Sequence, residues 1–195
     1  MKEIIPKDSR YVPFTQQKSC CVPTSILTVM YKLGIPLISQ ELLGFYLGLT
    51  VDEERGKLFW NARVGEEPPS GFGSQIYKKE YEPNTAFKKL GISLEMIIHP
   101  IKKFRDKKKF IDFVENFIEE DRDCLISFNH GILKKDGTNN GHTCVVDQIY
   151  PERNIIRLID PSSNQKKWRE VDIDLLKEAM EKHPVRGGFL ELKKI

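Results

Sequence analysis

Residues 16–25 of the chain read QQKSCCVPTS, and two of the protein's four cysteines stand side by side within them. Cys21 falls at the first turn of an apolar run that ends at Gly34, a common helix stop. Pro23 suits this assignment because proline is tolerated in the first turn of a helix. Unpaired backbone N–H groups at a helix start favour an anion, which lowers the pKa of a cysteine there. Cys21 is therefore a candidate nucleophile.

A nucleophilic thiolate needs an imidazole partner, and one of the four histidines lies in a fitting place. His142 begins the β-rich run HTCVVDQIY, just after the turn-like NNG. The next run, NIIRLID, closes with Asp160, whose carboxylate can accept the second ring N–H and fix the tautomer. If the intervening PERN makes a hairpin, Tyr150 pairs near Ile155. His142 and Asp160 then lie at the same edge of the sheet.

Acyl transfer through a thioester also needs hydrogen-bond donors for the oxyanion. The backbone N–H of Cys21 and a side-chain amide just upstream, from Gln16 or Gln17, can supply them. His130, in FNHGIL, is a rival base, but no acidic residue closes a following strand for it in the same way.

The length of 195 residues is within the range of one domain, and 39% hydrophobic with 30% charged residues is typical of a globular protein. Helical patterns dominate over about residues 1–120, and short β-rich runs dominate over about 121–195. This order predicts one α+β domain spanning residues 1–195. Residues 51–81 include RVGEEPPSGFGSQ and are expected to form a long loop that could line one wall of a cleft.

The overall charge argues against a nucleic-acid partner, because a net +3 is too small to indicate one. The basic residues at 102–109 are interpreted as the solvated face and start of an amphipathic helix over 106–120. The N-terminus lacks the apolar core of a signal peptide, and no apolar run approaches the ~20 residues of a membrane span. We therefore expect no membrane partner and a cytoplasmic location, where the cysteines are thiols. The sequence carries no signal for an oligomeric state.

A metal site is the main alternative use of the cysteines. Cys20, Cys21, His142 and Cys144 could supply zinc ligands, but adjacent cysteines rarely both reach one tetrahedral ion and the usual C-x2-4-C spacing is absent. We expect no metal and no cofactor. Cys20, Cys124 and Cys144 are expected to be core residues, because free cysteine is among the most buried residue types.

The whole pattern resembles a known family. A glutamine, a short gap, Cys-X-Pro-Thr-Ser, an apolar helix, and much later Gly-His before a strand and Asp-Pro after the next one are similar to the papain-like cysteine peptidases. The closest likeness is to their C39-like branch, whose members process leader peptides of secreted bacterial peptides. The resemblance covers about residues 12–34 and 139–162. It implies a papain-like fold, with a helical N-terminal half packed on a C-terminal antiparallel sheet.

The resemblance also implies roles for four residues: Cys21 as nucleophile, His142 as general base and acid, Asp160 as the orienting residue and Gln16 as the oxyanion donor. The predicted function is a cysteine-dependent hydrolase, a peptidase acting on a peptide or protein substrate without a cofactor. Two alternatives stay open. One is a catalytically silent binding or regulatory module, and the other is an acyl transferase using the same triad.

Two departures from the family pattern, at Val22 and Gln16, motivate the silent alternative. Val22 stands where the family usually has glycine or another characteristic residue, and four residues separate Gln16 from Cys21 where the family usually has five. Asp147 also occupies a stretch that is usually small and apolar in relatives.

Overall fold

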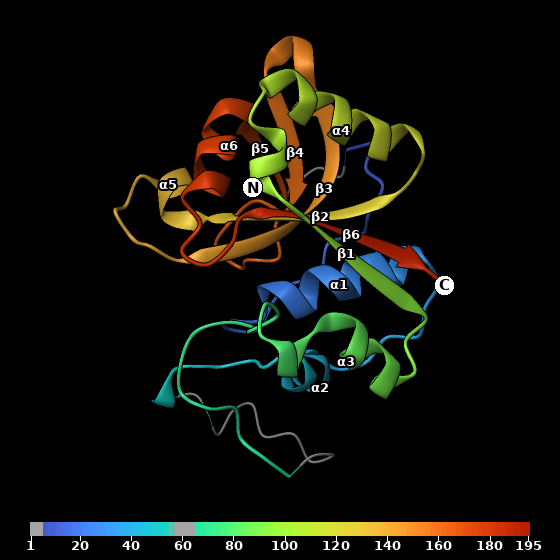
Figure 1. The fold of residues 1–195 in the computed structure, drawn as a ribbon, viewed down its shortest axis with the longest axis vertical. Helices are drawn as coiled ribbons and strands as arrows, with labels where there is room; N and C mark the ends of the chain where they lie inside the picture. Colours follow the sequence, from blue (N-terminus) through green and yellow to red (C-terminus); the bar gives the residue numbers. More distant parts are fainter. Residues whose placement is uncertain (1–5, 55, 57–64) are drawn as a thin grey trace.

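The computed structural model describes residues 6–54, 56 and 65–195, and these residues form one antiparallel sheet with helices on both faces (Figure 1). Its six strands pair in the order β1-β6-β2-β3-β4-β5. Their bounds are Leu94–Pro100 (β1), Asp123–Asn129 (β2), Gly141–Tyr150 (β3), Ile155–Ile159 (β4), Trp168–Asp172 (β5) and Gly188–Lys194 (β6). Short 3-10 turns lie at Lys79–Tyr81, Ile101–Phe104 and Pro151–Arg153.

The helices divide into two groups. Those covering one face of the sheet are α1 (Cys21–Lys32), α2 (Gln40–Tyr46) and α3 (Pro83–Leu90). Those of the other face are α4 (Lys107–Glu119), α5 (His130–Lys134) and α6 (Ile173–Glu181). Figure 1 shows α1–α3 below the sheet and α4–α6 above it. The predicted α+β architecture is confirmed, with the N-terminal helices packed on the sheet.

Alternation along the strands explains why the sheet can carry two cores. Leu125 and Val145 belong to the apolar cluster on the α1 side, whereas Ile126, Cys144 and Val146 belong to the cluster on the α4 and α6 side. Successive side chains of a strand point to opposite faces of the sheet, so a continuous apolar run supplies buried side chains to both faces. The helix α1 is buried over residues 22–30 and contacts β3. This contact brings the start of α1 to the sheet.

The predicted hairpin between β3 and β4 is confirmed, including its register. Tyr150 is the Cα partner of Ile155, and Val145 is that of Ile159. Asn154 closes the turn with φ of 56°, a left-handed conformation that asparagine tolerates. The ladder shifts register between Val146 and Gln148, which marks a β-bulge at Asp147.

Several elements differ from the sequence-based expectations. No sequence pattern predicts β5 or α5, because five residues are too few to show a clear helical or strand periodicity. The strand β1 pairs with β6, so the sheet draws on residues on both sides of the predicted boundary near residue 120.

The predicted helix over 106–120 is confirmed as α4, with Asp106 as its N-cap. The basic residues before and within it, Lys102, Lys103, Arg105, Lys107, Lys108 and Lys109, are exposed. Within the described ranges, no helix is both long and apolar enough to cross a bilayer.

Candidate active site

Cys21 is the first residue of α1, and the chain turns sharply just before it. Ser19 has φ of 66°, a left-handed conformation that serine adopts infrequently. Among the described residues no side chain caps the helix at Cys20, so the N–H groups of the first turn are open to an anion. Cys21 is half-buried, whereas Cys20 is fully buried in a small cluster with Leu49 and Val51. The two adjacent thiols therefore face different surroundings.

His142 and Asp160 lie together at the edge predicted from the hairpin. The Nε2 of His142 is 2.8 Å from Oδ1 of Asp160, and both side chains are buried. The backbone N–H of Ser162 donates to the same Oδ1 at 2.9 Å. Burial alone would raise the pKa of Asp160, but the hydrogen bond and charge of His142, with donors from Ser162 and Arg169, hold that pKa below its usual value.

The other ring nitrogen of His142, Nδ1, remains for the thiol. His142 lies close enough to Cys21 to act on the pKa of its thiol, so the structure brings together a thiol, an imidazole and a carboxylate. Burial opposes ionisation of Cys21. The hydrogen bond and positive charge of His142, together with the backbone N–H groups of Thr143 and Val22, outweigh it and lower the pKa of the thiol.

The pKa of His142 is shifted upward, which favours the protonated imidazolium form of the ring. Burial would lower it, but the neighbouring Cys144, Asp160 and Cys21 raise it well above the usual imidazole value. A lowered thiol pKa beside a raised imidazole pKa favours a thiolate–imidazolium pair at neutral pH.

The remaining cysteines are inert by the same reasoning. Burial raises the pKa of Cys20, with the charges of Cys21 and Glu41 adding to the effect. Burial and the charge of Asp160 raise the pKa of Cys144 to about 12. Of the four residues considered for zinc, Cys20 lies apart, while Cys21 and Cys144 both interact with His142.

The two candidate oxyanion donors have different environments. Gln17 is held on α2: its backbone N–H donates to Oε1 of Gln40 at 2.8 Å, and its amide donates to Glu41. The backbone N–H of Gln16 donates to the carbonyl of Pro161 at 2.8 Å, which places Gln16 beside the corner that follows Asp160. The buried Oε1 of Gln16 finds no donor among the described residues. Of the two side chains, that of Gln16 is the one not committed to α2.

The solved structures identify the architecture, although the chain matches no protein-family model and no curated protein. It matches the crystal structure of a candidate C39-like peptidase from Bacillus anthracis, with a TM-score of 0.56 and 14% identity, over 100% of this chain and 99% of that one. The chain has the C39-like peptidase fold. At this identity the likeness concerns the fold alone.

Two residues that lie next to the site, His130 and Arg169, were not predicted to belong to it. His130 stacks on His142 with 4.4 Å between ring centroids and 11° between planes, and Nη1 of Arg169 is 3.1 Å from its Nε2. The same Nη1 donates to Oδ2 of Asp160 at 3.2 Å. Arg169 lies in the unassigned strand β5, so no sequence pattern pointed to it.

His130, His142 and Asp160 also have the donor types of a metal site, and their ligand atoms lie within 4.8 Å of one another. Arg169 already places a guanidinium against two of the three. A metal ion would have to displace that cation.

Asp147, which departs from the family pattern, has a structural role in this C39-like fold. Its carboxylate accepts from Nε of Arg157 at 2.6 Å and from the backbone N–H of Arg10 at 2.8 Å. Arg157 also donates to Asp8 and to Tyr150. These hydrogen bonds hold the segment that precedes Gln16 against the strands β3 and β4.

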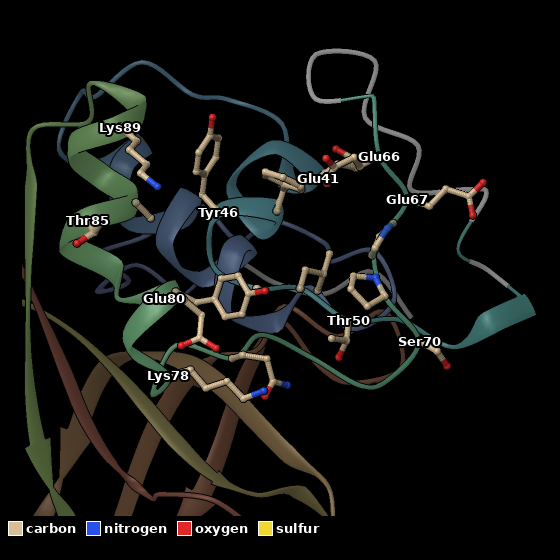
Figure 2. A pocket seen from close by; sticks show the side chains of 18 residues that line it. Glu41, Tyr46, Thr50, Glu66, Glu67, Ser70, Lys78, Glu80, Thr85 and Lys89 are labelled. Carbon is tan, nitrogen blue, oxygen red and sulfur yellow. The ribbon is translucent and has the colours of Figure 1, made fainter.

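A separate pocket of about 500 Å³ lies on the helical side of the C39-like fold (Figure 2). It is formed by α2, α3 and both arms of the predicted loop: Figure 2 shows Glu41, Lys89 and Ser70 around it. Glu41 also accepts from Gln17, so the pocket adjoins the segment before Cys21. Part of the predicted cleft wall, at residues 55 and 57–64, lies outside the described residues.

Proposed function

We propose that the protein is a cysteine-dependent hydrolase, a peptidase that cleaves an amide bond of a peptide or protein. The observation that carries the proposal is the grouping of Cys21, at the start of α1, with His142, whose Nε2 is 2.8 Å from Oδ1 of the buried Asp160. The directions of the two pKa shifts support the proposal, because a lowered thiol pKa and a raised imidazole pKa favour the ion pair that thiol catalysis uses. The C39-like fold supports the same class of reaction by analogy.

In the first half of the proposed reaction, the Cys21 thiolate attacks the amide carbonyl carbon and forms the C–S bond. The oxyanion that develops accepts hydrogen bonds from the backbone N–H of Cys21 and the Gln16 amide. His142 gives its Nδ1 proton to the amide nitrogen, the C–N bond breaks, and the amine leaves. Asp160 holds Nε2 and keeps Nδ1 directed at the thiol.

In the second half, water hydrolyses the thioester. The neutral His142 takes a proton from water at Nδ1, the hydroxide adds to the carbonyl carbon, and the C–S bond breaks. The products are a carboxylic acid and the regenerated thiolate–imidazolium pair. The chemistry proposed uses side chains and water alone.

We further propose that the protein works in a reducing compartment such as the cytoplasm, and without nucleic acid or membrane as partner. The reaction requires Cys21 as a free thiol, and all four cysteines are free in the structure.

The proposal is tested by iodoacetamide alkylation from pH 4 to 9, resolved by cysteine with mass spectrometry. Fast labelling of Cys21 with a lowered pKa is expected, because only the thiolate reacts. Cys20, Cys124 and Cys144 are internal controls, since burial raises the pKa of each. His142→Ala should return Cys21 to ordinary thiol behaviour.

Slow labelling of Cys21 with an unshifted pKa would reject the hydrolase and leave a binding module with the same fold. Where labelling is fast, hydrolysis of a peptide library in the wild type and its absence in Cys21→Ala complete the test. Products of amine exchange in place of hydrolysis would identify an acyl transferase.

A further inference from the structure

Arg169, in the strand β5, contacts two residues of the site region: Asp160 and His130. Its Cα partner in the neighbouring strand is Leu158, two residues before Asp160. The side chain is 13% exposed, and its Nη1 reaches both Oδ2 of Asp160 at 3.2 Å and Nε2 of His130 at 3.1 Å. One guanidinium thus contacts the carboxylate behind His142 and the ring stacked on it.

The contact with Arg169 fixes the state of His130. A guanidinium can only donate, so Nε2 of His130 accepts and its ring proton is on Nδ1. Burial, followed by the positive charges of His142, Lys134 and Arg169, lowers the pKa of His130 to about 3. His130 is therefore a neutral ring whose lone pair is already used. This geometry disfavours it as the base.

The contact between Arg169 and Asp160 determines how much net negative charge acts on His142. A bare buried carboxylate would hold the imidazolium proton strongly, because opposite charges attract more at low dielectric. A general acid and base works best when its pKa is near the working pH, since it must both give and take a proton. Pairing Asp160 with Arg169 offsets the carboxylate charge while leaving Oδ1 free to accept from Nε2.

We propose that Arg169 is a positioning residue of the thiol site: it balances the charge of Asp160 so that His142 can release its proton, and it holds His130 flat against the His142 ring. The inference rests on the proposed function and adds to it two residues that act through His142.

Few of the groups that face His142 change charge between pH 5 and 9. The groups around His142 and the stacked His130 come from α1, β3, the corner after β4, α5 and β5, and His183 lies beside Gly141. They are Cys21, Cys144, Asp160, His130, Lys134, Arg169 and His183. Burial lowers the pKa of His183 to about 4, and that of Cys144 is raised to about 12. A titration in this range therefore reports on His142 and Cys21.

The test measures the pH midpoint of the His142 ring by NMR of ¹⁵N-histidine-labelled protein in a Cys21→Ser background. With the Cys21 thiol removed, its own ionisation no longer contributes to the titration of His142. Arg169→Gln should raise this midpoint by on the order of one pH unit, because the carboxylate charge is no longer offset. Arg169→Lys should move it by less than half as much, since the charge is kept.

Arg153→Gln is the matched control. Arg153 pairs with Glu170 at the opposite end of β4 and is 53% exposed, so its loss removes the same charge far from the site. Its midpoint shift should be a few tenths of a pH unit at most, because exposed charges are screened. An Arg169→Gln shift no larger than this, or a downward one, would overturn the charge-balancing role.

The stacking role is tested with Cys21 intact. His130→Ala should slow Cys21 alkylation at neutral pH by about two- to tenfold, the range expected for losing an aromatic contact, and His130→Phe should restore most of the rate. If His130→Phe is as slow as His130→Ala, ring stacking is not the role of this residue. Ordinary thiol behaviour of wild-type Cys21 would reject the proposed hydrolase, yet the His142 midpoints in the Cys21→Ser background would still decide the role of Arg169.

Discussion

Two fully buried aspartates of one hairpin, Asp147 in β3 and Asp160 just after β4, each contact an arginine, yet their surroundings differ in kind. The partners of Asp147 are Arg157, a serine hydroxyl and the backbone N–H of Arg10. Asp160 shares its second partner, His142, with a thiol. The partners of Asp147 keep one charge state through the physiological range, whereas an imidazole can change its own there.

This comparison shows that a buried ion pair alone is weak evidence for a reactive centre. Both carboxylates are buried, hydrogen-bonded and charge-paired, and by those criteria they are alike. What separates them is a partner, His142, that titrates and that also acts on the thiol of Cys21. Asp147 anchors the N-terminal segment, and Asp160 is the one placed to influence chemistry.

The largest effect that we expect from this pair of sites is on stability. Asp147→Asn removes the buried one of the two charge partners of Arg157 and leaves the half-exposed Asp8. Breaking a buried pair costs about 3–5 kcal/mol of unfolding free energy, and the lower end of this range is expected because Asp8 remains. Urea denaturation at pH 7 measures it. Below the unfolding transition, the alkylation pKa of Cys21 should be unchanged. A shifted thiol pKa in folded Asp147→Asn would break the distinction between the two sites.

Asp160→Asn should change the chemistry instead. Removing the carboxylate charge destabilises the imidazolium, so the His142 midpoint should fall by on the order of one pH unit, opposite in sign to Arg169→Gln. The pH window in which Cys21 is alkylated as a thiolate–imidazolium pair should narrow accordingly. The ¹⁵N-histidine titration and the alkylation profile measure these shifts. An unmoved midpoint would mean that Asp160 only fills space.

The smallest effect is a pH dependence of stability. The folded-state pKa of Asp160 is lowered, so its stabilising contribution is complete above the unfolded value of about 3.9 and is lost as pH falls below it. The difference in urea midpoint between wild type and Asp160→Asn should therefore shrink between pH 6 and pH 3. A constant difference would show that the effect of Asp160→Asn on stability is not electrostatic.

Much of the site could be predicted because its signals are local. Cys21 lies at a helix start marked by Pro23, and the turn PERN fixes the hairpin register that brings His142 to Asp160. A short turn determines pairing by itself, so the register follows from a few residues.

The parts that could not be predicted depend on contacts between distant segments. Arg169 belongs to a five-residue strand with little period, and His130 was judged by its sequence neighbours although its partner is a ring on the adjacent strand. Asp147 departs from an apolar run of the sequence. Its carboxylate finds its hydrogen-bond donors, Arg157 and the backbone of Arg10, only in the folded protein. Whether a buried polar residue has hydrogen-bond partners depends on contacts that form only in the tertiary structure.

The contact of α1 with β3 has a consequence for the order of events during synthesis. Cys21 is translated well before His142 and Asp160, which lie far downstream in the sequence. On the proposed function, the thiolate–imidazolium pair cannot form in a nascent chain that still lacks His142. The thiol of Cys21 would then become reactive only after folding has brought these distant segments together.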